Sequence, residues 1–364
     1  MAHAWDWLKL LDEWYPPSSA EEWDNVGLQV GSRSWPADRV LVALDPTVGV
    51  IGEAAEKQCG LLITHHPLIF RPMSRIDLEE VEGRAVSAAV SSRVGVIACH
   101  TNADVASPGV SDALAEALDL DVAGPLQRTA GVGRMKLVAF VPPEATSKVL
   151  DAIASAGGGV IGEYSHCSFR VRGTGAFLPS ERARPVVGER GAINEVEEDR
   201  LEVVMPEDRL GDAVEAMVNA HPYEEVAYDV YPLAPGGGLG LGRLAVPRGY
   251  DTAAALAELC TERLGAQARL AGDPVRHVQS VALCGGSGAS LIPAAVRAKA
   301  DVYVTGDVKH HQALDAVAAG LTVIDAGHHG TELPFVAHLA ARLNDAGLGE
   351  VLVSEISTDP FAAR

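Results

Sequence analysis

The chain has 364 residues, 48% of them hydrophobic, so it can bury the cores of two or three domains at a usual size of ~100–200 residues each. It carries 29 Lys and Arg against 49 Asp and Glu, and the resulting net charge of −20 is spread along the chain. Such a field repels phosphate polymers and anionic lipids, which excludes nucleic acid and membrane surfaces as favoured partners. A small anionic substrate stays compatible if a metal ion neutralises it.

The cysteines and the N-terminal segment indicate a cellular compartment. The five cysteines are odd in number and include no CxxC pair, which favours free thiols in a reducing environment over disulfides or a thiolate zinc site. Asp6, Asp12 and Glu13 lie where a secretory signal needs basic residues and an apolar core. No window approaches the ~20 apolar residues of a membrane span. We therefore expect a soluble, cytoplasmic protein.

Short β-branched segments alternate with Ala-rich amphipathic segments, a pattern typical of β/α units with parallel strands. The predicted strands are 39–45, 60–64, 94–99, 280–286, 301–307 and 321–327. The predicted helices are 48–59, 79–93, 290–300, 312–320 and 333–347. The sequence therefore predicts two similar α/β halves that form one core.

The two halves share features of spacing that suggest an internal duplication. Leu41 to Ile63 and Val281 to Tyr303 both span 22 positions and cover strand, helix and strand. The third strand of each half is followed by a His and, four residues on, an acid. These pairs are His100 with Asp104 and His328 with Glu332.

A segment of different character separates the halves. It predicts a strand at 136–142, a helix at 146–157, two strands around 167–179, a polar loop, a strand at 200–206, a helix at 210–221 and a strand at 226–233. Apart from one additional predicted strand, this order is β-α-β-β-α-β, which we interpret as ferredoxin-like. A Gly-rich stretch suited to a linker follows it. The expected domains are 1–133, an α+β insert at 134–235, and 236–364.

Polar side chains gather where the predicted strands of the two outer halves end. Ligands of open α/β sheets bind beyond the carboxyl ends of strands, and seven of the twelve histidines follow such ends. They are His65, His66, His100, His310, His311, His328 and His329. Each histidine alone fits an ordinary surface loop, but parallel strands of one core would bring these ends into one crevice.

The side chains in this crevice favour a divalent metal site. Imidazoles and carboxylates without thiolates suit hard or borderline metals, and their number exceeds what one catalytic ion needs. We therefore expect a dinuclear centre, with ions roughly 3.5–4 Å apart that polarise a substrate oxygen and make hydroxide from water. Thr331 as a cap and Pro334 in a first turn predict that the last helix begins near Glu332, with His328 in the preceding loop.

Five motifs in order resemble those of the NIF-three-like family, whose bacterial members carry the label of type 2 GTP cyclohydrolase I homologues. The motifs are EEWDNVGLQVG (21–31), THHPL (64–68), HTNAD (100–104), YVTGDVKHH (303–311) and DAGHHGTE (325–332). The insert resembles the extra domain of longer members, and HPYEEVAYDVYPL (221–233) is similar to CutA and PII-type folds.

The resemblance implies a site for two divalent cations per chain, such as Zn, Fe or Mn. The positions that match the family's metal ligands are His65, His66, Asp104, His328 and Glu332, with Glu332 as the bridge. The resemblance also implies ring-shaped homohexamers whose sites face an interior cavity.

Several other residues keep two interpretations. His100 matches a family histidine near the site, and it either relays protons or orients a metal ligand. Asp307, His310 and His311 either bind substrate or form a structural loop. The CGGSG turn (284–288) is suited to cradle an anion. Asp24 or Asn25 either faces the crevice or forms an Asx turn that supports the fold, and we favour the turn. We interpret His329 and His338 as bystanders, and Tyr223, Glu224 and Glu225 as either a regulatory ligand site or a subunit or domain contact.

These observations lead to two functional hypotheses. The first is a metal-dependent hydrolase that acts on a nucleotide or a related small molecule through metal-bound hydroxide, with His100 as the catalytic side chain. The second is a metal-binding or metal-delivery protein in which the insert serves as a sensor. An open coordination position favours the enzyme, whereas fully ligated ions that exchange readily favour the carrier.

Overall fold

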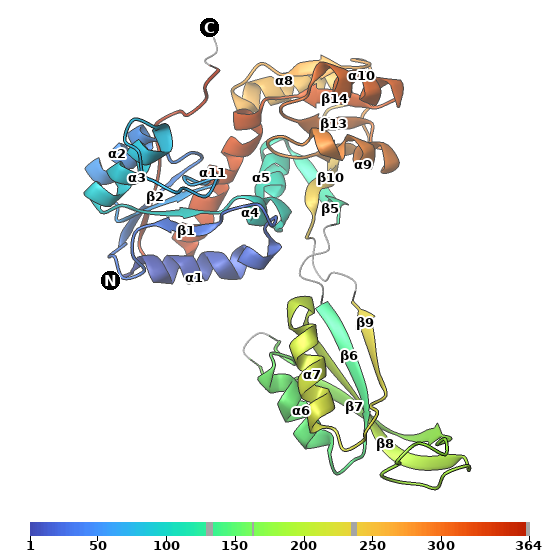
Figure 1. The fold of residues 1–364 in the computed structure, drawn as a ribbon. Helices are drawn as coiled ribbons and strands as arrows, with labels where there is room; N and C mark the ends of the chain where they lie inside the picture. The colour runs from blue at the N-terminus through green and yellow to red at the C-terminus, as the bar shows by residue number, and fades with distance from the viewer. Residues whose placement is uncertain (129–133, 162–163, 234–238, 362–364) are drawn as a thin grey trace. The chain divides into compact units, whose positions relative to one another are not determined.

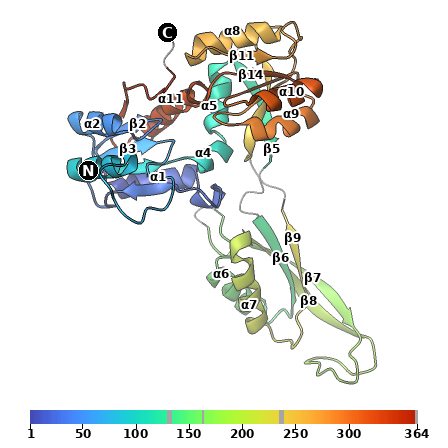
Figure 2. The same cartoon turned by 45° about the horizontal axis from the view of Figure 1, so that its top comes forward.

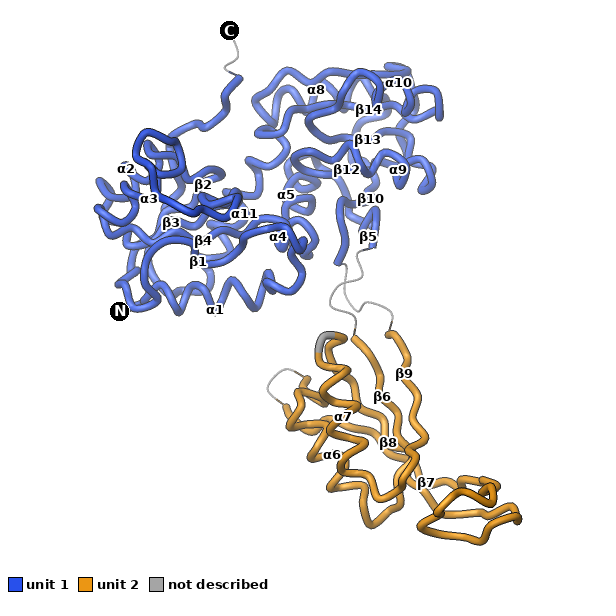
Figure 3. Tube along the Cα trace, viewed as in Figure 1, with its two compact units in different colours: residues 1–129, 237–364 blue, residues 130–236 orange. Residues whose placement is uncertain are grey.

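The computed structural model describes residues 1–128, 134–161, 164–233 and 239–361 (Figure 1). The chain divides into two compact units: Met1–Thr129 with Gly237–Arg364 form unit 1, and Ala130–Gly236 form unit 2 (Figure 3). Within the described ranges, no helix is long and apolar enough to cross a membrane.

Unit 1 contains a five-stranded sheet in the order β1-β4-β3-β2-β15. Its strands are β1 (Gly27–Val30), β2 (Arg39–Ala43), β3 (Leu61–Thr64), β4 (Gly95–Ala98) and β15 (Glu350–Val353). All are parallel except β1, which pairs antiparallel with β4 at the edge. The central strands are buried runs of Val, Leu and Ile, as expected where helices cover both faces of a parallel sheet.

Helices cover both faces of this first sheet (Figures 1 and 2). On one face, Val40 and Val42 of β2 contact the core formed with α1 (Ala4–Trp14) and α11 (His328–Ala346). On the other face, Leu41 contacts the core formed with α2 (Val48–Glu56) and α3 (Val81–Ser92). Alternate residues of one strand thus supply two separate cores.

A second sheet of unit 1 has six strands in the order β11-β14-β13-β12-β10-β5. The strands are β5 (Leu120–Gln127), β10 (Leu241–Pro247), β11 (Arg269–Ala271), β12 (Val281–Leu283), β13 (Val302–Thr305) and β14 (Thr322–Asp325). The strands β12, β13 and β14 are parallel neighbours, and the others are antiparallel. Its cores contain α5 (Val110–Ala117) with α8 (Ala253–Leu264), and α9 (Ile292–Arg297) with α10 (His310–Ala318). The α/β class is confirmed.

The outer halves, predicted as 1–133 and 236–364, exchange strands. Strand β5 of the first half pairs with β10 in the second sheet, and β15 of the second half pairs with β2 in the first. Helix α5 also contributes to one core of each sheet. Ala113 belongs to the core that the first sheet forms with α1 and α11, and Leu114 belongs to the core that the second sheet forms with α8. Each sheet is therefore completed by a strand from the other half of the chain, and the two sheets belong to one unit.

Unit 2 has a four-stranded antiparallel sheet in the order β7-β8-β6-β9. Its elements follow the chain as β6 (Arg134–Val141), α6 (Thr146–Ser155), β7 (Ser168–Phe177), β8 (Asn194–Pro206), α7 (Leu210–Ala220) and β9 (Tyr228–Pro232). Both helices lie on one face of the sheet (Figures 1 and 2). The prediction of two strands around 167–179 is wrong: β7 is one strand, and its partner β8 begins at Asn194 because pairing continues through acidic residues.

Candidate metal centre

The predicted metal-site residues come from three segments of unit 1. His65 and His66 directly follow β3, which ends at Thr64. Asp104 lies on the short helix α4 (Thr101–Val105), which follows β4 and His100. His328 and Glu332 lie on α11, which follows β14. The ends of parallel strands from both sheets therefore meet at this place.

The side chain of Glu332 is the centre of the cluster. Its Oε2 lies 3.0 Å from Nε2 of His66 and 3.1 Å from Nε2 of His328. Its Oε1 lies 3.6 Å from Nε2 of His65, and that nitrogen lies 3.8 Å from Oδ1 of Asp104. The structure thus brings together the five residues that the sequence selected.

The position of His328 differs from the prediction. Helix α11 begins at His328 rather than near Glu332, so the two side chains lie one turn apart on one helical face. Thr331 does not cap the helix, because its hydroxyl donates back to the carbonyl oxygens of Gly327 and His328. Pro334 lies inside the helix instead of at its start.

The histidines are oriented through their Nδ1 atoms. His66 Nδ1 lies 2.7 Å from Oδ1 of Asp45, and His328 Nδ1 lies 2.7 Å from Oδ2 of Asp307. His65 Nδ1 lies 2.8 Å from the carbonyl oxygen of Cys99. Each contact leaves Nε2 facing the cluster, which is the common arrangement around metal-binding histidines.

His100 has the same kind of support. Its Nδ1 lies 2.8 Å from Oδ1 of Asp24, whose Oδ2 accepts from the backbone amide of Thr101 at 3.0 Å. The His100 ring lies 5.3 Å from the ring of His65 and 5.6 Å from that of His66, measured between centroids. The interpretation of Asp24 as an Asx turn is therefore incomplete, since its carboxylate mainly fixes His100 and the start of α4.

Two supporting residues were missed or underrated in the sequence. Asp45 follows β2 and Asp307 follows β13. Both therefore lie beyond the carboxyl end of a strand, which is the criterion that selected the histidines. The sequence pattern placed Asp307 in a substrate-binding or structural loop and indicated no role for Asp45. Applying the rule to carboxylates as well as imidazoles would have found both.

The cluster is strongly coupled electrostatically. Burial lowers the pKa of His66, but contacts with Asp45 and Glu332 outweigh burial and raise that pKa to about 10. Contact with Glu332 raises the pKa of His328 to about 9. Burial raises the pKa of Glu332, yet the histidines around it hold that pKa well below its ordinary value. Burial also raises the pKa of Asp104. The carboxylate and imidazoles thus form a charged group inside the protein.

The residues fit a divalent metal ion. Nε2 of His65 and Oε2 of Glu332 are buried, and among the described residues neither has a partner in hydrogen-bond geometry. Polar atoms in that state are costly unless something else binds them. Two groups of donors converge within 4.8 Å: His65, His66 and His100, and His66, His328 and Glu332. Asp104 belongs to neither group, although it lies beside His65.

Comparisons with known proteins identify the family of the chain. The family model described as Duf34/NIF3 (NGG1p interacting factor 3) matches residues 3–360. The chain belongs to the NIF3 family. It is 40% identical to the "GTP cyclohydrolase 1 type 2 homolog" of Bacillus subtilis, over 97% of this chain and 96% of that protein. It is also 40% identical to the protein of the same name from Mycobacterium tuberculosis, over 98% of this chain and 96% of that protein.

Solved structures show the same fold. A Bacillus cereus protein described as related to NIF3 matches with a TM-score of 0.73 and 38% identity, over 100% of this chain and 99% of that one. The Staphylococcus aureus protein SA1388 matches with a TM-score of 0.80 and 30% identity, over the same shares. A CutA structure from Archaeoglobus fulgidus covers 28% of the chain with a TM-score of 0.22, so the CutA-like nature of unit 2 stays a prediction.

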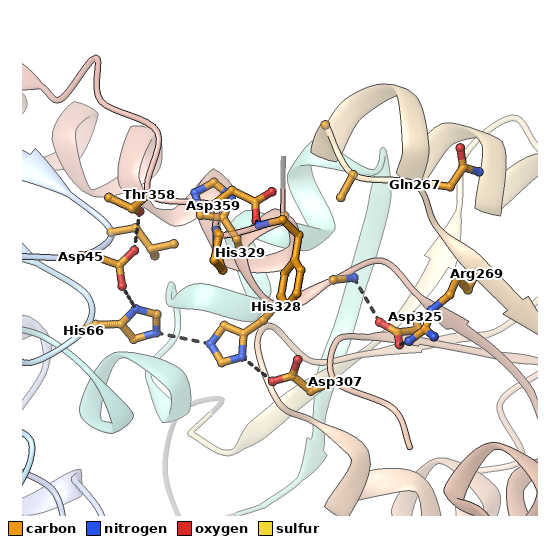
Figure 4. Close-up of a pocket in the computed structure, with 17 residues that line it drawn as sticks. Asp45, His66, Gln267, Arg269, Asp307, Asp325, His328, His329, Thr358 and Asp359 are labelled. Atoms are coloured by element: carbon orange, nitrogen blue, oxygen red, sulfur yellow. Dashed lines mark hydrogen bonds and ion pairs between the residues drawn. The ribbon is translucent and has the colours of Figure 1, made fainter. Parts of the chain in front are cut away.

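A pocket of about 810 Å³ opens beside the cluster around Glu332 (Figure 4). His66 and His328 lie in its wall, and Figure 4 shows them facing each other, with Asp45 behind one and Asp307 behind the other. The other wall residues include Arg269, which is paired with Asp325, and the C-terminal residues Thr358 to Phe361. A small molecule in this pocket would reach the candidate metal centre.

The CGGSG turn does not form the expected anion cradle. The amide of Gly286 donates to Oγ1 of Thr331, and that of Gly288 donates to Oγ1 of Thr305. A Cβ at Gly286 would collide with Oε1 of Glu332. Position 286 therefore needs glycine, because the backbone there lies directly against the carboxylate of Glu332.

The remaining candidates lie outside the cluster. His310 and His311 are exposed at the start of α10 and contact each other's rings. His329 lines the pocket of about 810 Å³, and His338 pairs with Glu116. Tyr223, Glu224 and Glu225 line a pocket of about 720 Å³ within unit 2. The structure does not bring any of these residues into the group around Glu332.

Proposed function

We propose that this NIF3-family protein is a metal-dependent hydrolase that holds two divalent cations, such as Zn, Fe or Mn, and acts on a nucleotide or related small molecule. The observation that carries the proposal is the position of the Glu332 carboxylate. Its two oxygens face different histidines, Oε1 toward His65 and Oε2 toward His66 and His328. A carboxylate placed in this way is suited to bridge two ions.

The donors divide naturally into two sets. His65, Asp104 and Oε1 of Glu332 would hold one ion, and His66, His328 and Oε2 would hold the other. Paired divalent ions supply Lewis acidity and lower the pKa of water. The donor set of nitrogen and oxygen without sulfur matches borderline and hard divalent metals.

His100 is the proposed proton-transfer residue. Its Nδ1 is fixed by Asp24, so its Nε2 is directed to the histidine cluster. The contact with His100 and Thr101 holds the pKa of Asp24 below its ordinary value despite the opposing effect of burial. An ionised Asp24 therefore keeps the His100 ring in one tautomer, which is suited to accept or release a proton at Nε2.

One observation favours metal delivery as a second candidate function. The side chain of His328 is 38% exposed at the pocket, whereas that of His65 is fully buried. An ion on the His328 side is therefore accessible to an acceptor. In this alternative, unit 2 would act as a sensor domain.

The sequence and its family resemblance together support further proposals about domain type, assembly, location and partner. We infer that unit 2 is ferredoxin-like and related to CutA or PII, because its sheet places the first and third strands in the centre, as β6 and β8. We also infer a ring-shaped homohexamer and a cytoplasmic location. The expected partner is a small molecule rather than nucleic acid or a membrane.

Turnover assays separate the two candidate functions. The metal-loaded protein is tested against nucleotides, phosphoesters and cyclic amides, with His100→Asn and the exposed control His311→Asn. The hydrolase proposal predicts metal-dependent turnover that His100→Asn lowers at unchanged metal content, whereas His311→Asn behaves as wild type. Absence of turnover, with rapid transfer of the bound ions to an apo-acceptor, would favour delivery.

A further inference from the structure

Two exposed aromatic rings flank His100. Trp23 lies in the loop before β1 and is 59% exposed, and Phe70 lies in the loop after His66 and is 45% exposed. Their ring centroids are 5.7 Å apart, and each ring also contacts the imidazole of His100, at 6.1 Å and 6.3 Å. The exposed rings are therefore continuous with the candidate metal centre.

The loops that carry these rings are fixed to each other. Asn25 Nδ2 donates to the carbonyl oxygen of Ile69 at 2.6 Å. Gln29 Oε1 accepts from the backbone amides of Leu68 and Ile69 at 2.7 Å and 2.9 Å. These contacts join the segment that follows Trp23 to the residues that precede Phe70. The two rings are therefore held next to each other without being buried.

Their exposure contrasts with that of the aromatic residues in the core of unit 1. Trp7 and Tyr15 are fully buried, and Phe335 is 1% exposed. Leaving an indole and a phenyl ring in water forgoes the hydrophobic stabilisation that burial gives. Trp23 and Phe70 meet edge to face, with 65° between their ring planes, and an exposed aromatic ring suits a bound planar ring, which gains apolar contact and favourable ring–ring geometry.

We propose that Trp23 and Phe70 form a subsite that binds a planar heteroaromatic ring of the substrate beside Nε2 of His100. The choice of a ring-bearing substrate rests on the proposed function. Because the two rings are inclined at 65°, the bound ring stacks on one of them and meets the edge of the other. Stacking of this kind holds bases on aromatic side chains with little dependence on which base is bound. Nε2 of His100 is the polar atom that would meet a ring heteroatom, because its Nδ1 is taken by Asp24.

The test uses the full-length, metal-loaded protein and guanosine as the probe, because guanosine carries a planar ring without phosphates. Binding is followed by tryptophan fluorescence and by calorimetry, with ribose as the probe that lacks the ring. Trp23→Ala and Phe70→Ala should each weaken guanosine binding about tenfold. Trp23→Phe should retain most of the affinity, because it keeps an aromatic ring. Trp5→Ala is the matched control, since Trp5 is 40% exposed on α1 and contacts Arg33 instead.

Three results would overturn the subsite: no guanosine binding by the wild-type protein, equal affinity in Trp23→Ala, or equal affinity for ribose. A smaller oligomer in Trp23→Ala with guanosine binding intact would also overturn it and would assign the rings to a subunit contact. Metal content is measured in every variant. Guanosine binding that depends on Trp23 in a protein without any turnover would support the subsite while the hydrolase proposal fails.

Discussion

Oε2 of Glu332 on α11 lies 3.0 Å from Nε2 of His66, which follows β3. These residues come from opposite ends of the chain, and they meet because α11 contacts both sheets of unit 1. Helix α11 starts beside the second sheet, after β14, and its later residues belong to the core of the first sheet. The candidate metal centre therefore forms only when unit 1 is fully folded.

Replacement of Glu332 should remove most of the bound metal. In Glu332→Ala, both proposed ions lose a ligand, and we expect the metal content to fall from up to two divalent ions per chain to well below one. Elemental analysis of the purified protein measures this directly. His311→Ala serves as the control, because His311 is exposed and belongs to neither group of converging donors. Unchanged metal content in Glu332→Ala would mean that the ions bind elsewhere.

Asp307 should influence metal affinity without being a ligand. Its carboxylate orients His328 through a contact of 2.7 Å, and loss of such a supporting contact typically weakens metal binding about 10–100-fold. Asp307→Ala should show a weakening of this size in a competition titration with a chelator. Asp315→Ala, an exposed aspartate on α10, should titrate like the wild type. If both variants keep the wild-type affinity, the orientation of His328 does not depend on Asp307.

A buried ion pair should stabilise the region around Asp104. Arg243 is 1% exposed, its Nε lies 2.9 Å from Oδ1 of Asp112, and its guanidinium also donates to the carbonyl oxygen of Ala106, just after α4. Arg243→Ala removes the cation that pairs with the mostly buried carboxylate of Asp112, whose side chain is 15% exposed, and should cost about 3 kcal/mol in the free energy of unfolding. Urea unfolding followed by circular dichroism measures the loss.

The chain offers a matched control for Arg243. Arg248 pairs with Asp121 in the same bidentate manner, but both side chains are exposed. Because water and salt screen exposed ion pairs, Arg248→Ala should change stability little. Equal losses for the two variants would refute the role given to burial.

Unit 2 should lose stability in acid through Asp199. The hydrogen bond from Arg172 lowers the pKa of this carboxyl, and Thr146 donates a further hydrogen bond. A carboxyl with a lowered folded-state pKa stabilises the fold above its unfolded pKa of about 3.9 and loses this contribution as the pH falls through the folded value. Hydrogen exchange of α6 in the full chain should therefore show less acid-induced loss of protection in Asp199→Asn than in the wild type.

The control for Asp199 is Glu215→Gln, which changes an exposed carboxyl on α7. Its exchange should follow the wild type at every pH. If α6 lost as much protection in acid in Asp199→Asn as in the wild type, groups other than Asp199 would cause the acid sensitivity.

Local patterns predicted the buried strands of unit 1 well. The runs 39–45, 60–64 and 94–99 contain β2, β3 and β4, because parallel strands covered on both faces are continuous in apolar residues. The strand ends then selected His65 and His66 without knowledge of the fold. What the spacing could not show was which oxygen of Glu332 faces which histidine, since that depends on how the two sheets meet.

Other features depended on contacts between distant segments. Strand β15 pairs with β2, which lies 311 positions earlier in the chain. It has only four residues, too few to show a reliable hydrophobic periodicity. The start of α11 was misjudged because Thr331 and Pro334 gave local signals for a later start. Placement of Glu332 against three imidazoles overrides those signals, as tertiary contacts commonly override local propensity.

Anomalous diffraction from crystals of the metal-loaded protein, collected at the absorption edge of the bound metal, tests the central claim most directly. The proposal predicts two peaks roughly 3.5–4 Å apart, one beside His65 and Asp104 and the other beside His66 and His328, with Glu332 between them. A single peak, or peaks that do not contact Glu332, would contradict a dinuclear centre bridged by this carboxylate.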